Sequence, residues 1–381
     1  MSLSIGIVGL PNVGKSTLFN ALLERAQAEA ANRPFTTIEP NEGIVDVPDP
    51  RLAKLAELVK PEQVVPATVK FVDIAGLVAG ANKGEGLGNQ FLSHIRETTA
   101  VALVVRCFED SEVTHVAGKL NPVDDLRTVL LELILADQQT LEKLLRPLEK
   151  EAKGSGTAGK EAAERLELLK RIAAAFDGEQ PASAAATEFN ADERKKLAAG
   201  PPLPLITLKP MIVVANVDEG DVAKPGTNSF YQEAERWAQE QGGPEDGGMG
   251  IVAVSAKIEA EIGALAPEER TDFLKDVGLE EPNLNRFIRA GYELLDLITF
   301  YTAGPKEARA WPIKAGSSAP QAAGTIHGDF EDKFIRAEVI GYDDYVAAGS
   351  ESAARDAGKQ RTEGKDYVVQ DGDVMHIRHG S

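Results

Sequence analysis

Residues 9–16 read Gly-Leu-Pro-Asn-Val-Gly-Lys-Ser, and this stretch decides the fold. It matches the phosphate-binding pattern G-x-x-x-x-G-K-[ST], follows the apolar run 4–8 and precedes the helix-like run 17–23. In such a loop the backbone N–H groups and the helix N-terminus bind phosphate, Lys15 reaches the β- and γ-phosphates, and Ser16 ligates Mg²⁺. Because strand, loop and helix are all present, a chance glycine turn is the weaker interpretation. The stretch therefore predicts a site for a nucleoside triphosphate.

The composition is that of an ordinary globular protein. The 381 residues are 43% hydrophobic and 27% charged, which favours two or three folded domains. No apolar stretch approaches the roughly 20 residues that span a bilayer, and the first strand leaves no room for a signal peptide. The single cysteine, Cys107, cannot form an internal disulfide, as is usual in a reducing cytosol. We expect a cytoplasmic protein without a membrane anchor.

The net charge of −19 bears on the choice of partner. Generic nucleic-acid affinity comes mainly from lysine and arginine, so this charge argues against direct, sequence-specific nucleic-acid binding. Net charge by itself says nothing about the fold. We expect a monomer, in which any contact with nucleic acid would be local.

Short apolar, β-branched runs recur at residues 5–8, 69–72, 101–105, 211–215 and 251–254. Such runs, separated by helical patterns, are typical of strands buried on both faces of a parallel sheet. A sheet of this kind binds its ligand at the carboxyl ends of the strands. We predict an α/β nucleotide-binding domain made of residues 1–125 and 205–296.

Residues 126–204 interrupt this domain with a helical pattern. Leucines in 126–148 recur at three- and four-residue steps, a glycine-rich break follows, and 166–176 repeats the apolar face. The pattern predicts two antiparallel, coiled-coil-like helices around a tip. Asn190 and Glu193 resemble a capping pair and predict a further short helix. The insertion is interpreted equally well as an arm that contacts a partner and as a structural elaboration.

Residues 297–381 have a different pattern, of strands and turns. The run 334–340 alternates partly between apolar and polar residues, and the runs 367–369 and 374–377 flank a turn. We predict a compact mixed domain that is rich in β-structure.

The remaining phosphate and metal groups follow the loop at suitable distances. Asp73 directly follows a predicted strand and is the expected acid on the Mg²⁺ side, and Gly76 can turn its N–H toward the γ-phosphate. Thr37, preferred over Thr36 by analogy, can add a hydroxyl. Alone, either segment would more often be an ordinary loop. Together with the phosphate loop they predict a metal site of Ser16, Thr37 and Asp73.

Base recognition is expected after two later strands, at Asn216-Val217-Asp218-Glu219 and Ser255-Ala256-Lys257. Ras-type GTPases carry N-K-x-D and S-A-K at such places. Here Glu219 replaces the aspartate that reads guanine, and Val217 replaces the stacking lysine. The extra methylene disturbs the bidentate pairing, which predicts weaker guanine selectivity and a shift toward adenine. The predicted nucleotide-binding residues are Asn12, Val13, Gly14, Lys15, Ser16, Thr17, Gly76, Asn216, Val217, Glu219, Ser255 and Ala256.

Over essentially its whole length the sequence resembles the YchF or Obg-like ATPase family, a branch of the Obg-related translation-factor GTPases. The resemblance rests on PFTTIEPN at 34–41, on KGEGLGN at 83–89 and on the segment 326–339, which begins IHGDF. It implies a P-loop NTPase G domain with an inserted α-helical coiled-coil arm and a C-terminal TGS domain of β-grasp type. It also implies binding of ATP as well as, or better than, GTP, and association with ribosomes.

The motifs above do not identify the group that activates the attacking water. Leu77 stands where Ras-like enzymes carry a glutamine, so hydrolysis is slow or another residue supplies the polar group. The resemblance indicates His115, whose imidazole can orient water near neutral pH. A loop histidine without a catalytic role is the competing interpretation, and His94 is a weaker candidate. Asn12 resembles an asparagine that coordinates K⁺ in potassium-activated relatives, although asparagine also favours turns.

These features predict a slow, Mg²⁺-dependent ATPase that also accepts GTP. The resemblance implies that it acts as a ribosome-associated switch in translation or stress response, and residues 33–41 and 76–88 are the two expected switch segments. Two alternatives remain: a GTP-selective switch that tolerates Glu219, and a nucleotide-binding module without significant turnover.

Overall fold

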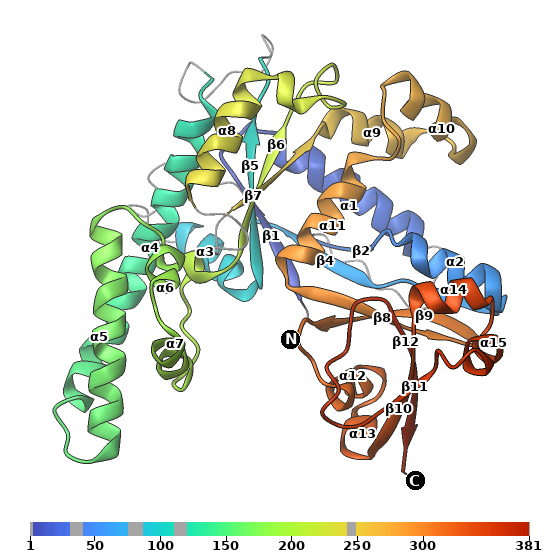
Figure 1. Ribbon diagram of the computed structural model, residues 1–381. Helices are drawn as coiled ribbons and strands as arrows, with labels where there is room; N and C mark the ends of the chain where they lie inside the picture. The colour runs from blue at the N-terminus through green and yellow to red at the C-terminus, as the bar shows by residue number, and fades with distance from the viewer. Residues whose placement is uncertain (1–2, 31–40, 75–86, 110–119, 242–248, 381) are drawn as a thin grey trace. The chain divides into compact units, whose positions relative to one another are not determined.

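The computed structural model in Figure 1 describes residues 3–30, 41–74, 87–109, 120–241 and 249–380. Its internal contacts divide the chain into two compact units. The first unit comprises Met1–Gly43 and Lys70–Phe287, and the second comprises Ile44–Val69 and Ile288–Ser381. The second unit is thus assembled from two separate parts of the sequence.

A six-stranded sheet in the order β2-β4-β1-β5-β6-β7 organises the first unit. The strands are β1 (Ser4–Val8), β2 (Glu42–Asp46), β4 (Thr68–Asp73), β5 (Ala100–Arg106), β6 (Met211–Asn216) and β7 (Gly250–Val254). The chain passes between the units within β2 and β4. From β4 to β7 all neighbours pair in parallel.

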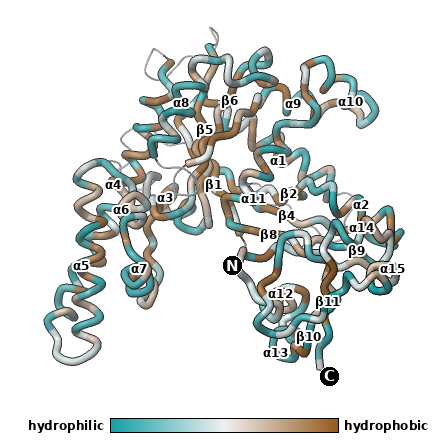
Figure 2. The backbone as a smooth tube through the Cα atoms, in the orientation of Figure 1, coloured by the Kyte–Doolittle hydropathy of each residue, from teal (hydrophilic) through white to brown (hydrophobic). Residues whose placement is uncertain are grey.

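The predicted strand positions are confirmed. All five apolar runs form strands of this sheet, and every residue of β1, β5 and β6 is buried. Figure 2 shows the hydrophobic colour of the chain around β1, β5 and β6. This burial is expected of parallel strands that are covered on both faces.

The helices around this sheet are α1 (Lys15–Ala30), α3 (Leu87–Glu97), α8 (Ser229–Glu240), α9 (Ala256–Ala264), α10 (Pro267–Asp276) and α11 (Asn283–Leu294). Two 3₁₀ turns, Ile206–Leu208 and Pro225–Thr227, flank β6. Asn228 begins α8, because its side chain accepts a hydrogen bond of 2.9 Å from the N–H of Tyr231. Among the described residues, no helix is long and apolar enough to cross a membrane.

The predicted helical insertion is an arm of four helices: α4 (Pro122–Glu151), α5 (Thr157–Asp177), α6 (Ala182–Thr187) and α7 (Ala191–Ala198). α5 packs antiparallel to α4, as Figure 1 shows. Asn190 and Glu193 form a complete capping box at α7, which confirms that prediction. Gly156 at the tip has φ +91°, a backbone conformation that only glycine adopts without strain. A Cβ on Gly159 would lie 2.1 Å from the carbonyl oxygen of Gly154.

A buried carboxylate joins the arm to the strand that follows it. Asp137 of α4 is 0% exposed, and it accepts hydrogen bonds of 2.7 Å from the N–H groups of Ile206 and Thr207 and from the Thr207 hydroxyl. The Thr207 hydroxyl oxygen in turn accepts from the N–H of Ala182, the first residue of α6. Burial raises the pKa of Asp137, and these hydrogen bonds partly offset that shift. Asp137 therefore fixes the exit of the arm just ahead of β6.

The second unit contains a sheet in the order β11-β10-β12-β8-β9-β3. Its strands are β3 (Gln63–Val65), β8 (Leu297–Ala303), β9 (Glu307–Lys314), β10 (Phe334–Gly341), β11 (Arg361–Glu363) and β12 (Asp373–His379). Its helices are α2 (Pro50–Val59), α12 (Ala319–Ile326), α13 (Gly328–Asp332), α14 (Tyr342–Ala348) and α15 (Glu351–Asp356). This mixed architecture matches the prediction for residues 297–381.

The apolar run at 367–369 forms no strand of this sheet. The residues make a single isolated bridge, between Ser318 and Val368. The carbonyl oxygen of Tyr367 accepts from the N–H of Ala319, and the N–H of Val369 donates to Ser317. Because these backbone groups bind Ser317 and the first residue of α12, they are not available to a strand ladder. The prediction of a strand here was wrong.

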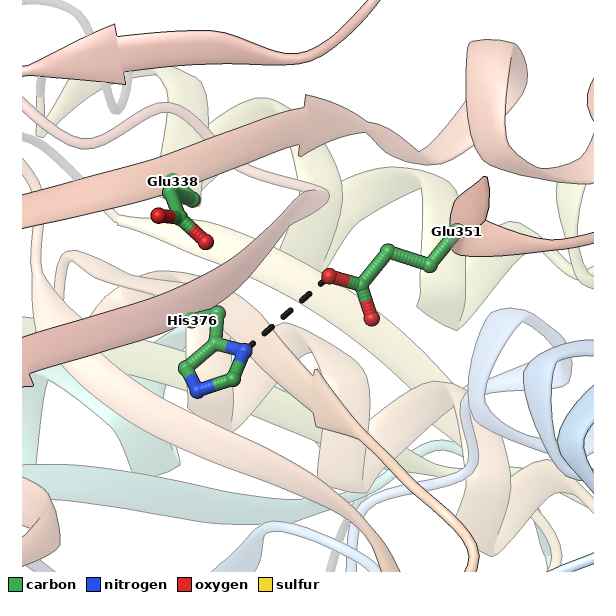
Figure 3. A group of neighbouring side chains, drawn as sticks. All are labelled: Glu338, Glu351 and His376. Atoms are coloured by element: carbon green, nitrogen blue, oxygen red, sulfur yellow. Dashed lines mark ion pairs between the residues drawn. The ribbon is translucent and has the colours of Figure 1, made fainter. Parts of the chain in front are cut away.

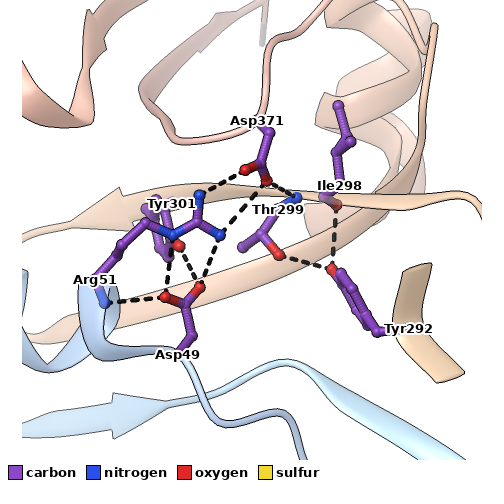
Figure 4. A network of polar contacts seen from close by, with 7 residues as sticks. All are labelled: Asp49, Arg51, Tyr292, Ile298, Thr299, Tyr301 and Asp371. Atoms are coloured by element: carbon purple, nitrogen blue, oxygen red, sulfur yellow. Dashed lines mark hydrogen bonds and ion pairs between the residues drawn. The ribbon is translucent and has the colours of Figure 1, made fainter. Parts of the chain in front are cut away.

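Residues 44–69 lie in the second unit, although the predicted bounds included them in the nucleotide-binding domain. Figure 4 shows one reason: the guanidinium of Arg51 binds the carboxylates of both Asp49 and Asp371. Tyr301 also donates to Asp49, and the N–H of Thr299 donates to Asp371. Burial alone would raise the pKa of Asp49, but the hydrogen bonds from Arg51 and Tyr301 lower it. In addition, β3 pairs with β9.

Candidate functional site

Four predicted segments meet at the carboxyl edge of the parallel sheet. The phosphate loop follows β1, Asp73 ends β4, Asn216 ends β6, and Ser255 follows β7. In the parallel register Ile7 lies opposite Asp73. Because parallel strands end at one edge, these residues lie together, as expected of a nucleotide site.

The phosphate loop has the backbone that its sequence predicts. A Cβ on Gly9 would lie 2.4 Å from the carbonyl oxygen of Val104. Gly14 has φ +93°, and a Cβ there would lie 2.2 Å from the amide nitrogen of Asn216. Asn12 is also left-handed, with φ 63°. Both glycines are therefore required by close approach, and Gly14 also by its dihedral angle.

Lys15 is held inside this loop. Its ammonium donates a hydrogen bond of 2.7 Å to the carbonyl oxygen of Leu10, and the residue is only 7% exposed. Burial lowers the pKa of Lys15 to about 8, although the Asp73 carboxylate counteracts this shift. Burial likewise raises the pKa of Asp73, against the effect of Lys15. Ser16 and Thr17, in the first turn of α1, are exposed.

Asn216 connects the segments predicted to recognise the base to the phosphate loop. Its amide nitrogen donates a hydrogen bond of 3.0 Å to the carbonyl oxygen of Val13, and its amide oxygen accepts a hydrogen bond of 3.0 Å from the N–H of Ala256. Val217 is buried, and its N–H donates to Val254. The structure thus shows Asn216 positioning two neighbouring segments, and its binding of nucleotide stays a prediction. The pattern N-x-x-E alone does not reveal this positioning.

Glu219 and Lys257 form an ion pair beside these segments. Lys257 was not among the predicted binding residues, although it is the lysine of the Ser-Ala-Lys segment. Ser255 caps α9 by accepting from the N–H of Ile258 at 3.5 Å, which places Lys257 in the first turn of that helix. The segment predicted to recognise the base therefore carries a paired carboxylate.

Three predicted site residues, Thr37, Gly76 and His115, lie outside the described residues, as do Leu77 and both predicted switch segments apart from Asn41, Leu87 and Gly88. His94, the weaker catalytic candidate, is exposed on α3. The other predicted residues are all at the edge described above.

Glu338, Glu351 and His376 approach one another in the second unit, as Figure 3 shows, with Nδ1 of His376 4.0 Å from a carboxylate oxygen of Glu351. Carboxylate and imidazole are metal-ligand types. However, Arg378 donates to both carboxylate oxygens of Glu338, at 3.3 and 3.0 Å, and lowers its pKa. The cluster is therefore an ion-pair network on β10, α15 and β12, in which Arg378 compensates the charge of Glu338.

The arm has a groove of about 590 Å³ between α4, α5, α7 and the chain that follows α7. Leu144 and Leu148 contribute to its apolar lining. Lys196 at its rim is paired with Glu164 at 3.3 Å and Asp192 at 2.8 Å. The charges of this part of the rim thus compensate one another within the arm.

Family models match both ends of the chain. One, described as a 50S ribosome-binding GTPase, matches residues 4–140. The other, a model of the C-terminal region of YchF GTPases described as a protein of unknown function, matches residues 297–380.

Full-length relatives extend this similarity. The chain is 52% identical to the ribosome-binding ATPase YchF of Haemophilus ducreyi and 50% identical to that of Bacillus subtilis, each over 99% of both chains. The solved structure of the Schizosaccharomyces pombe YchF GTPase is 36% identical, with a TM-score of 0.86 over 99% of this chain and 98% of that one.

Proposed function

This chain belongs to the YchF family, and we propose that it binds ATP, hydrolyses it slowly with Mg²⁺, also accepts GTP, and acts as a nucleotide-dependent switch on the ribosome. The observation that carries the proposal is the joint placement of the phosphate loop, Asp73 and the Glu219 segment at one sheet edge. The P-loop domain supplies the nucleotide-binding chemistry. Glu219, where an aspartate would read guanine, supports ATP as the preferred ligand.

The side chains at the phosphate end fit a triphosphate with Mg²⁺. The hydroxyl of Ser16 and the carboxylate of Asp73 are hard oxygen donors, which Mg²⁺ prefers, and Thr37 is the third proposed ligand. Bound Mg²⁺ would neutralise charge on the phosphate oxygens. Lys15, once it leaves the Leu10 carbonyl, would bind the β- and γ-phosphates. We propose that Asn12 adds a K⁺ site next to them.

Slow hydrolysis follows from the sequence after Asp73. Leu77 cannot accept or donate a hydrogen bond to the attacking water, so positioning of that water falls to another group. We propose His115 for this function, since a neutral imidazole can orient and polarise water. Turnover by His115→Ala distinguishes this proposal from a module that binds nucleotide without hydrolysis.

The ribosome is the proposed partner because the bacterial relatives are ribosome-binding ATPases. A ribosomal partner also supports a cytoplasmic location. On the arm, Lys153 and Lys160 near the tip are exposed and have no ion-pair partner among the described residues, whereas Lys196 is held by two carboxylates. We therefore propose the arm tip as the contact with ribosomal phosphate.

Titration of the nucleotide-free protein with ATP and GTP in Mg²⁺ tests the nucleotide preference. We expect tighter binding of ATP, measured by calorimetry. Glu219→Asp should shift the ratio of the two dissociation constants toward GTP by about tenfold, because the shorter side chain restores the geometry for guanine. Tighter GTP binding by the unaltered protein would instead make it a GTP-selective switch.

Co-sedimentation with purified ribosomes, with ATP present, tests the partner. Lys153→Glu combined with Lys160→Glu should lower the bound fraction and flatten its salt dependence, since each lost phosphate contact reduces the salt slope by about one. Lys224→Glu combined with Lys275→Glu, the same charge change elsewhere in the first unit, should bind like the unaltered protein. Equal losses in both double variants would exclude the arm tip as a specific contact.

A further inference from the structure

Glu219 and Lys257 come from two different strand ends of the sheet. Glu219 lies three residues beyond the end of β6, and Lys257 lies in the first turn of α9, directly after β7. Their side chains form an ion pair with relative exposures of 39% for Glu219 and 71% for Lys257. The hydrogen bond from Lys257 to Glu219 raises the pKa of the ammonium, and Glu261 and Asp218 add to this electrostatically. The ammonium thus faces three carboxylates.

The backbones that carry the pair are fixed to each other. Asn216 bonds the Val13 carbonyl on one side and the Ala256 N–H on the other. The N–H of Val217 donates a hydrogen bond of 2.9 Å to the carbonyl oxygen of Val254. Exposed ion pairs on unconnected segments contribute little, because ordering the two side chains costs entropy. Here the flanking chain is already held, so donor and acceptor are presented side by side.

We propose that Lys257 and Glu219 read the base together, as one donor–acceptor unit, and that Lys257 is what admits adenine. This inference rests on the proposed nucleotide site. Adenine offers an amino donor, N6–H₂, next to the N1 acceptor, which complements a carboxylate next to an ammonium. Guanine also offers O6 next to N1–H, but with the ammonium on one carboxylate oxygen of Glu219, its N1–H and N2–H₂ compete for the other oxygen.

A carboxylate without the lysine would discriminate less against guanine. With both oxygens available, Glu219 could accept from N1–H and N2–H₂ of guanine, in a geometry less favourable than that of an aspartate, whereas adenine offers only one donor and would leave its N1 unpaired. The carboxylate of Glu219 binds the hydrogen-bond donors of either base, and the ammonium of Lys257 supplies the donor that N1 of adenine requires. Acceptance of both nucleotides thus follows from the pair, beyond the effect of the longer side chain of Glu219.

Lys257→Met tests this inference, because methionine keeps the unbranched apolar stem of the side chain and removes the donor. We expect the ratio of the GTP to the ATP dissociation constant, measured by calorimetry in Mg²⁺, to fall at least about fivefold, as expected for one charge-assisted hydrogen bond near solvent. The matched control is Lys275→Met, which removes an equally exposed lysine paired with Asp272 on α10. It should leave the ratio unchanged.

A double-mutant cycle isolates the pair. In a Glu219→Gln background, Lys257→Met should no longer move the ratio toward GTP. An unchanged ratio in Lys257→Met, or an equal loss of ATP and GTP affinity, would overturn the inference, since the ammonium would then act only on the triphosphate charge. If the unaltered protein bound neither nucleotide, the proposed function itself would be contradicted.

Discussion

Lys15→Ala should weaken ATP binding by at least about 100-fold, the equivalent of about 3 kcal/mol lost from charge-assisted hydrogen bonds to phosphate. The side chain is buried at the phosphate loop, and its ammonium donates a hydrogen bond of 2.7 Å to the carbonyl oxygen of Leu10. A triphosphate would offer stronger acceptors to the same ammonium. Calorimetry with ATP and Mg²⁺ measures the loss, and Lys224→Ala, an exposed lysine of the same unit, serves as the control.

The pH dependence of binding provides an independent check on Lys15. Its pKa is lowered to about 8 by burial in the nucleotide-free protein, and a bound polyanion raises it again. Binding above pH 8 therefore requires proton uptake, so ATP affinity should fall by about tenfold per pH unit there and be level just below pH 8. Lys15→Ala should lack this decline. A decline of equal slope in the variant would assign the titration to another group.

Asp137→Ala should lower the free energy of unfolding of the first unit by about 3–5 kcal/mol. The substitution leaves two backbone N–H groups, those of Ile206 and Thr207, without an acceptor in a fully buried place. It also removes the acceptor of the Thr207 hydroxyl. Chemical denaturation, followed by fluorescence and circular dichroism, measures the change.

Two further variants make this expectation specific. Asp137→Asn keeps one carbonyl oxygen and should recover part of the loss. Asp177→Ala, an exposed aspartate at the end of α5, should change stability by no more than about 0.5 kcal/mol. A loss below about 1 kcal/mol in Asp137→Ala would mean that water replaces the carboxylate, and that the arm is not held by this residue.

Local patterns predicted much of the fold. The runs that became β1, β4, β5, β6 and β7 are apolar because a parallel sheet is buried on both faces. The same holds for the arm, where leucine spacing reflects the period of one helix, and for the capping box at Asn190, which spans only four residues. The phosphate loop could be predicted from the sequence because its glycines, Lys15 and Ser16 lie within one short stretch.

Contacts between residues far apart in the sequence could not be predicted from local patterns. The run at 367–369 is apolar enough for a strand, but its backbone is bound by Ser317 and Ala319, some fifty residues earlier. Arg51 gives no local sign that it joins Asp371, 320 positions away. Asp137 resembles any polar residue on a helix until its partners at Ile206 and Thr207 are known.

The sequence by itself predicted the phosphate loop, an acid after the second predicted strand, a glutamate in the predicted base-recognition segment, and a helical insertion. Each of these depends on residues that are neighbours in the chain, so each leaves a local pattern. Only the tertiary structure decided which groups are paired, namely Lys15 with the Leu10 carbonyl, Asn216 with two loops, and Glu219 with Lys257. The physical reason is that burial, pKa shifts and hydrogen-bond partners depend on contacts between strand ends that lie far apart in the sequence. No single segment of the sequence encodes those contacts.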